Sequence, residues 1–217
     1  MTKKRVGILI SGRGSNMAAL IEACRAPDYP AEIVVVISNS PDAAGLETAR
    51  AEGILAVAID HKAYPTRGDF EAVMHRALVN AGVELICNAG FMRLLTTDFV
   101  EVWRNRQLNI HPSLLPAFRG LHTHERALEA GVRITGCTVH FVRFEMDEGP
   151  IVAQAAVPVL PDDTAETLGQ RVLATEHKLY PHALRLIASG EAWADGDAVR
   201  FRSPEGKSGA LFSAASP

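Results

Sequence analysis

Short apolar runs alternate with amphipathic stretches along the N-terminal half of the chain. A continuous apolar run such as 6–10 is typical of a strand that is covered on both faces of a sheet. In the stretch 69–81 the apolar residues recur every three to four positions, which indicates a helix with one buried face. The expected strands are 6–10, 33–37, 55–58 and 83–87, and the expected helices are 17–23, 43–52 and 69–81. This alternation predicts a parallel sheet with right-handed crossovers.

The pattern changes after Pro112, where strands begin to follow one another directly. The stretches 134–142 and 151–159 are strand-like, and the short turn 146–150 between them predicts antiparallel pairing. Asp162 and Asp163 suit the N-terminus of a long amphipathic helix that ends near Ser189. The remaining expected elements are a helix over 121–130 and a small hairpin over 193–199.

The predicted fold class is α/β, with a Rossmann-like open twisted sheet. Its N-terminal half, about 1–105, is expected to be mainly parallel, and its C-terminal half, about 106–202, mixed or antiparallel. We expect a single domain over 1–202, because no linker long enough to separate two domains interrupts it. Residues 203–217 are rich in Ser, Gly, Ala and Pro and are expected to form a flexible tail.

The composition of the chain mainly excludes classes of partner and cell location. The chain has 217 residues and a net charge of −3, so no overall basic field attracts nucleic acid. The apolar run after the basic start is too short to span a membrane, and it lacks the cleavage pattern of a signal peptide. The three cysteines, Cys24, Cys87 and Cys137, are widely spaced, which is typical of free thiols in a reducing compartment. We expect a cytoplasmic protein.

A glycine-rich loop lies between the first expected strand and the first expected helix. Gly14, Ser15 and Asn16 stand where backbone N–H groups at a helix start can bind a phosphate. The third glycine of a dinucleotide fingerprint is replaced by Met17, and the second strand ends in Ser38 and Asn39 instead of an acid. These features favour a monophosphate over NAD or ATP. The alternative is a tight turn with Ser15 as the helix N-cap.

The stretch Asn109-Ile110-His111-Pro112 carries the clearest candidate chemistry. A carboxamide and an imidazole two residues apart point to the same side of an extended backbone. Pro112 prevents a helix and keeps the following loop extended. A carboxamide can donate to a developing oxyanion, and an imidazole can carry a proton near neutral pH. The alternative, that both side chains only satisfy backbone groups in a loop, stays open on spacing alone.

Other polar residues are less specific. His122 and His124 have no Cys or carboxylate partner at metal-ligand spacing, so no metal site is predicted. His140 lies within an expected strand and could face either side. Arg67 and Arg93 could bind anions or be ordinary surface arginines.

Taken together, five motifs resemble the folate-dependent formyltransferases, in particular the branch that acts in purine biosynthesis. The resemblance runs from about residue 5 to residue 200. The motifs are, in chain order, Ser11-Gly12-x-Gly14-Ser15-Asn16, Ala89-Gly90-Phe91-Met92-Arg93, Asn109-Ile110-His111-Pro112-Ser113-Leu114-Leu115-Pro116, Gly120-Leu121-His122-Thr123-His124 and Asp147-x-Gly149-Pro150.

The resemblance implies an enzyme that transfers the formyl group of 10-formyltetrahydrofolate, as co-substrate, to the amine of glycinamide ribonucleotide. It implies small-molecule substrates, no metal, no nucleic acid and no membrane, and either a monomer or a homodimer. The alternatives are another 10-formyltetrahydrofolate-dependent formyltransferase, a deformylase, or a non-enzymatic nucleotide-binding module. The last of these has no use for a His–Asp pair beside an asparagine.

The resemblance also assigns residues. It implies Asn109, His111 and Asp147 as the catalytic trio, and Gly14, Ser15, Asn16 and Glu176 as contacts to the ribonucleotide. The implied folate contacts are Arg67, Met92, Arg93, Leu94, Leu95, Asn109, Arg143, Phe144, Glu145, Met146 and Asp147. Two residues depart from the family pattern: Phe144 stands at a position that usually holds an acid, and Glu148 at one where glycine is frequent.

These residue types suit formyl transfer. Attack of an amine on the formyl carbon produces a tetrahedral oxyanion, and each N–H donor to it is worth roughly 3–4 kcal/mol. Asp147 can hold His111 in its charged form and help to move a proton from the attacking nitrogen. We expect the turn around Asp147 to stay partly hydrated.

Overall fold

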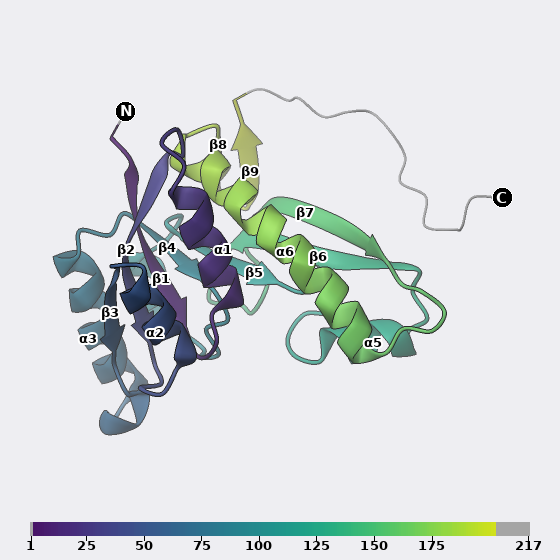
Figure 1. The fold of residues 1–217 in the computed structure, drawn as a ribbon, viewed down its shortest axis with the longest axis horizontal. Helices are drawn as coiled ribbons and strands as arrows, with labels where there is room; N and C mark the ends of the chain where they lie inside the picture. The colour runs from purple at the N-terminus through teal and green to yellow at the C-terminus, as the bar shows by residue number, and fades with distance from the viewer. Residues whose placement is uncertain (1, 203–217) are drawn as a thin grey trace.

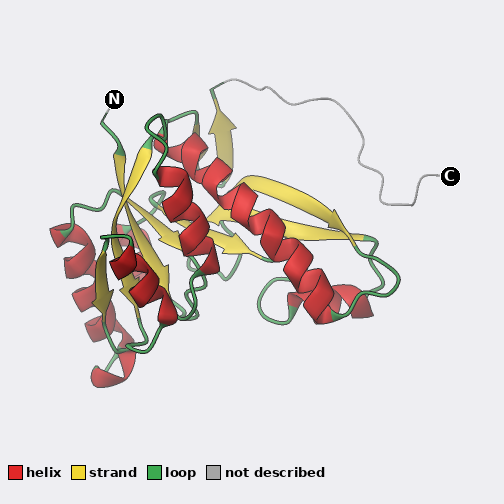
Figure 2. Ribbon diagram, in the orientation of Figure 1, coloured by secondary structure: helices red, strands yellow, loops and turns green. Residues whose placement is uncertain are grey.

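The computed structural model describes residues 2–202, so the tail expected at 203–217 lies outside the described residues. Seven strands form one sheet between layers of helices (Figures 1 and 2). These strands are β1 (Lys4–Ile10), β2 (Ala31–Ser38), β3 (Leu55–Ala58), β4 (Leu85–Asn88), β5 (Gln107–His111), β6 (Ile134–Phe141) and β7 (Ile151–Pro158). A separate hairpin follows, formed by β8 (Ala192–Asp195) and β9 (Ala198–Phe201).

The order of the strands across the large sheet is β3-β2-β1-β4-β5-β6-β7. The first five strands in this order pair in parallel, whereas β5 with β6 and β6 with β7 pair antiparallel. The predicted fold class, a mainly parallel sheet that becomes antiparallel toward its C-terminal edge, is confirmed.

Helices cover the two faces of the sheet unequally. One face packs against α1 (Ser15–Cys24), α2 (Ala44–Ala51), α5 (Thr123–Glu129) and the long α6 (Ala165–Ala188). In Figure 1, α1 and α6 lie side by side over this face. The other face packs against α3 (Arg67–Asn80) and the short α4 (Thr97–Val102). We call these the α6 face and the α3 face.

The alternation of side chains along each strand decides which residues belong to which face. Ile8 and Ile10 of β1 lie in the core of the α6 face, and Leu9 between them lies in the core of the α3 face. On β5, Leu108 and Ile110 belong to the core of the α6 face. Gln107, Asn109 and His111 therefore point to the α3 face, and there they meet polar groups and a cavity.

The structure adds two short elements that the hydrophobic pattern did not predict, α4 and a 3-10 turn at His61–Ala63. Both are too short to show a helical period. A capping signal for α4 is present, because the hydroxyl of Thr96 accepts a hydrogen bond from the Phe99 N–H. At α6 the expected start is found, where Thr164 and Thr167 form a capping box. No helix within residues 2–202 is long and apolar enough to cross a membrane.

Candidate active site

A cavity of about 540 Å³ opens on the α3 face, beside the carboxyl ends of β4 and β5. Its size lies within the range of roughly 300–1,000 Å³ that is usual for small-molecule sites, and open α/β sheets bind ligands at this edge. Residues from six segments line it: Arg67, Asn88, Phe91, Met92, Arg93, Leu94, Leu95, Val100, Asn109, His111, Gly120, Leu121, His140, Val142, Arg143, Phe144, Met146 and Asp147.

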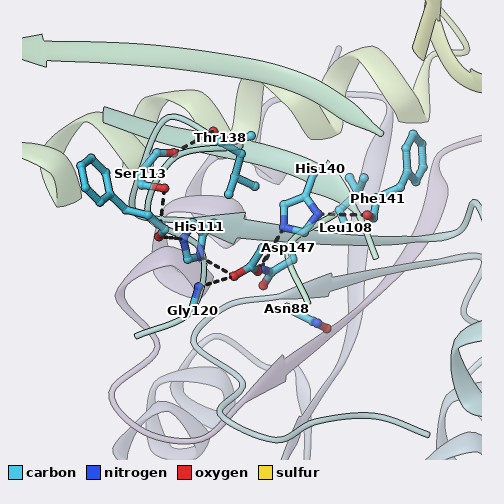
Figure 3. Close-up of polar contacts among 12 residues, drawn as sticks. Asn88, Leu108, His111, Ser113, Gly120, Thr138, His140, Phe141 and Asp147 are labelled. Atoms are coloured by element: carbon cyan, nitrogen blue, oxygen red, sulfur yellow. Dashed lines mark hydrogen bonds and ion pairs between the residues drawn. The ribbon is translucent and has the colours of Figure 1, made fainter. Parts of the chain in front are cut away.

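His111 and Asp147 meet at the wall of this cavity, although they are far apart in sequence (Figure 3). The Nδ1 atom of His111 lies 3.4 Å from Oδ2 of Asp147, and its Nε2 atom lies 3.0 Å from the carbonyl oxygen of Phe118. Both ring nitrogens thus face acceptors, and a protonated imidazole can donate to both. The expected contact between His111 and Asp147 is present.

Asp147 is more enclosed than the sequence suggested. Its side chain is only 10% exposed, whereas its turn neighbours Met146 and Glu148 are exposed. The turn is therefore partly hydrated as expected, but the carboxylate itself is largely enclosed. The reason is that the carboxylate lies against His111, while Oδ2 accepts a hydrogen bond of 2.8 Å from the Gly120 N–H (Figure 3). The backbone of Asp147 is left-handed, with φ 58°, a conformation that is uncommon for a residue other than glycine.

The loop after β5 is tied to β6, which holds His111 in place. The Thr138 hydroxyl donates to the Ser113 carbonyl at 2.7 Å and accepts from the Leu115 N–H at 3.0 Å. The Ser113 hydroxyl donates to the Ala117 carbonyl at 2.6 Å. The loop that follows β5 is therefore held against β6 and by its own hydrogen bond, in keeping with the rigid segment expected after Pro112.

His140 is a site residue whose direction the sequence left open. It is the register partner of Asn109 across the β5–β6 ladder and is only 2% exposed. Its Nε2 atom lies 3.2 Å from Nδ2 of Asn109 and 3.8 Å from Oδ1 of Asp147. Burial lowers the pKa of His140 below its ordinary value, against smaller opposing effects of the hydrogen bond to the Phe141 carbonyl and of the Asp147 carboxylate. The apolar neighbours Val139 and Phe141, which face the α6 core, are the signal that could have placed it on the α3 face.

Asn88 is a second such residue, on the other side of Asn109. It pairs in register with Asn109 across the β4–β5 ladder, and its side-chain oxygen accepts from Nε2 of Gln107 at 3.0 Å. Asn88, Asn109 and His140 therefore form a polar row across three neighbouring strands, and all three line the cavity.

Most of the residues that the resemblance assigned to folate lie around this cavity. Glu145 is the exception, because it is exposed and lies outside the lining. Phe144, which departs from the family pattern, is 56% exposed and lies at the mouth together with other exposed apolar side chains. Glu148, the other departure, forms an ion pair with Arg119.

The glycine loop borders a second, smaller hollow of about 290 Å³. Its lining consists of Ser11, Gly12, Arg13, Gly14, Ser15, Asn16, Ala89, Gly90 and Met92. Met92 borders both cavities, so the two are neighbours. The N-cap of α1 is Gly14, in a left-handed conformation with φ 70°, and not Ser15 as in the alternative reading of this loop. No side chain caps this helix start, which leaves its first N–H groups available to an anion.

Glu176 of α6 lines neither cavity but is joined to the glycine loop. Its carboxylate accepts a hydrogen bond of 2.7 Å from Nδ2 of Asn16, and both residues are buried. Burial raises the pKa of Glu176 above its ordinary value, although the bond from Asn16 acts in the opposite direction.

The two histidines that follow Gly120 form no metal site with other described residues. No group of three His, Cys, Asp or Glu side chains within 2–202 could hold a metal ion. The His122 ring is exposed beside Glu125, and burial lowers the pKa of His124.

Comparison with known proteins gives consistent matches. The formyl transferase family model matches residues 4–184. The phosphoribosylglycinamide formyltransferase of Haemophilus influenzae is 39% identical over 203 residues, which cover 90% of this chain and 96% of that protein. The trifunctional purine biosynthetic protein adenosine-3 of Gallus gallus is 52% identical over 87% of this chain, but this chain spans only 19% of that protein's length.

A solved structure supports the same relationship. Glycinamide ribonucleotide transformylase 1 from Symbiobacterium toebii superimposes with a TM-score of 0.89 at 50% identity, over 92% of this chain and 94% of that one. The matches extend over most of the chain, and they include the segments that build both cavities. This chain belongs to the formyl transferase family.

Proposed function

We propose that this chain transfers the formyl group of 10-formyltetrahydrofolate to the amine of glycinamide ribonucleotide. The products are formylglycinamide ribonucleotide and tetrahydrofolate, and the reaction belongs to de novo purine biosynthesis. The names of the relatives support formyl transfer to this ribonucleotide, and the folate donor follows from the family resemblance. The observation that carries the proposal is two adjoining cavities of different chemistry, with the polar trio at the wall of the larger one.

The smaller cavity suits the ribonucleotide. Its left-handed glycine and free helix start can hold a phosphate, as proposed for Gly14, Ser15 and Asn16. Glu176, which is bonded to Asn16, is assigned to the same substrate. The buried Oδ1 atom of Asn16 has no hydrogen-bond partner among the described residues, so it can accept from a substrate donor.

The larger cavity suits the folate. Its apolar wall can cover a flat heteroaromatic ring system, and its arginines can face the carboxylates of a glutamate tail. We assign folate contacts to Arg67, Met92, Arg93, Leu94, Leu95, Asn109, Arg143, Phe144, Met146 and Asp147. Glu145, which lies outside the lining, stays a weaker assignment from the resemblance alone.

The trio performs the transfer. The substrate amine attacks the formyl carbon, a new C–N bond forms, and the carbonyl oxygen becomes an oxyanion. An N–H of Asn109 donates to this oxygen, a contribution of roughly 3–4 kcal/mol, and the positive charge of protonated His111 stabilises the same oxygen electrostatically. Asp147 keeps His111 charged and helps a proton pass from the attacking nitrogen to the folate nitrogen that leaves, as the old C–N bond breaks.

The remaining expectations belong to the same proposal. Catalysis uses no metal, and the enzyme acts in the cytoplasm as a monomer or homodimer. Residues 1–202 form a single domain, which the continuous sheet supports.

The test is an absorbance assay for deformylated folate, run with glycinamide ribonucleotide present and then withheld. We expect product only when the ribonucleotide is present, and no release of formate. An equal rate without the ribonucleotide, with formate released, would instead identify a deformylase. His111→Asn, which removes the imidazole, should be inactive in the same assay and excludes a contaminating activity.

A further inference from the structure

His140 is held from both of its ring nitrogens, and this determines which nitrogen carries the proton. Nδ1 lies 3.0 Å from the carbonyl oxygen of Phe141, as Figure 3 shows. A carbonyl oxygen can only accept, so Nδ1 must carry a hydrogen. In the neutral ring, Nε2 is then the acceptor.

Burial outweighs the charges around His140 and leaves the ring neutral. The groups that face the ring are Asp147, at 3.8 Å from Nε2, His111 and Arg143. Burial, the largest effect, favours the neutral ring, and so do His111 and Arg143. The Phe141 carbonyl and the Asp147 carboxylate favour the charged ring, and the net effect is a lowered pKa of His140.

A neutral ring with its lone pair on Nε2 determines the orientation of the Asn109 carboxamide. Nε2 lies 3.2 Å from Nδ2 of Asn109, so it accepts a hydrogen bond from one of the two N–H groups of that amide. If the amide were turned over, its oxygen would face the lone pair of Nε2, and two acceptors would oppose each other.

We propose that His140 is a positioning residue that orients the Asn109 carboxamide by accepting a hydrogen bond at Nε2. One amide hydrogen is bound to His140, and the second is then available to the oxyanion of the formyl transfer. This inference rests on the proposed function for its catalytic consequence, but its structural part, the tautomer of His140 and its bond to Asn109, can be tested without turnover.

The structural part is tested by NMR on the ligand-free enzyme at neutral pH, with nitrogen-15 labelling. We expect His140 to be neutral with its proton on Nδ1, and we expect His140→Leu to shift the side-chain amide signals of Asn109. A charged ring, or a proton on Nε2, would overturn the proposal, as would unmoved Asn109 signals in His140→Leu.

The catalytic part is tested by kinetics of a pair of variants. His140→Leu removes the acceptor, and His140→Gln retains one near the position of Nε2. We expect His140→Leu to lower kcat by at least about 10-fold, and by no more than the ~10²–10³-fold that loss of one oxyanion donor causes. KM for both substrates should change by less than about 3-fold, because the oxyanion exists only in the transition state. His140→Gln should recover a large part of kcat. His75→Leu, a partly buried histidine packed on Trp103 outside both cavities, is the control and should leave kcat unchanged.

A double-mutant cycle separates this role from a purely structural one. If His140 acts through Asn109, then His140→Leu in an Asn109→Ala background should change kcat by less than about 2-fold. A full additional loss in that background, or equal activities of His140→Leu and His140→Gln, would overturn the proposal. If the parent enzyme does not formylate the ribonucleotide at all, the proposed function fails, while the NMR result still decides the structural part.

Discussion

The two faces of β5 have opposite chemistry although they belong to the same five residues. Leu108 and Ile110 are buried in the apolar core under α6, whereas Asn109 and His111 face the cavity. The apolar face also helps to fix the polar one. The hydroxyl of the buried Tyr180 of α6 lies 3.1 Å from each of the carbonyl oxygens of Asn88 and Leu108, to which it can donate. It thus ties β4 and β5 to the α6 face. A core on one side of a strand thus provides the rigid support that a catalytic group on the other side requires.

The largest expected effect lies on the polar face. His111→Ala should lower kcat by ~10²–10⁴-fold, because it removes the charged imidazole that we propose to carry a proton and stabilise the oxyanion in the transition state. Binding of a folate analogue should be nearly unchanged, and calorimetric titration of that analogue is the measurement beside kcat. A kcat within a few-fold of the parent would remove His111 from the mechanism.

The neighbouring residue on the apolar face should show the reverse behaviour. Leu108 is fully buried, so Leu108→Ala should lower the free energy of unfolding by about 2–5 kcal/mol. Its kcat per folded molecule should stay far closer to the parent than that of Asn109→Ala. Urea unfolding and steady-state kinetics of the two variants make the comparison. If both variants lost mainly stability, or both mainly kcat, the apolar face would not serve stability and the polar face would not serve catalysis as we expect.

The glycine loop offers a third comparison, between two glycines of equal backbone conformation. Gly14 and Gly53 have φ of 70° and 71°, but only Gly14 borders a cavity. Alanine at either position should cost about 1–2 kcal/mol of stability from left-handed strain. Only Gly14→Ala should also raise KM for the ribonucleotide, by ~10-fold, because its Cβ would lie 3.1 Å from the buried Met17 side chain and displace the loop whose N–H groups hold the phosphate. Equal KM values in the two variants would contradict the phosphate assignment.

The smallest effect concerns the N-terminus of α6, the helix that supports the apolar face. Two hydrogen bonds from Arg171, at 2.7 and 2.8 Å, hold the pKa of Asp163 well below its usual value of 3.8. A lowered carboxyl pKa stabilises the fold above the unfolded value, and this contribution is lost as the pH falls through the folded value. Asp163→Asn should therefore lower Tm by a few degrees at pH 7, with the difference shrinking below about pH 4. Glu47→Gln, in an exposed ion pair with Arg50, is the control and should leave Tm nearly unchanged.

The sequence predicted this architecture well because both faces of the parallel strands are apolar and the helices have a clear period. Its limits have physical causes. The helix α4 is too short for a hydrophobic period, and only its cap at Thr96 indicates it. His140 and Asn88 belong to the site through strand register, Asn109↔His140 and Asn88↔Asn109, and register is a long-range property. The enclosure of Asp147 depends on Gly120, which comes from another loop.

In the proposed mechanism the charge of Asp147 beside His111 drives the chemical step, and a single-turnover experiment tests this role. Asp147→Asn retains the shape of the side chain and an oxygen that can accept from Gly120, but it removes the charge 3.4 Å from His111. With both substrates saturating, rapid quenching should show formyl transfer slowed by at least ~10²-fold, with formylglycinamide ribonucleotide still the product. A single-turnover rate within a few-fold of the parent would mean that the charge of Asp147 plays no part in the chemical step.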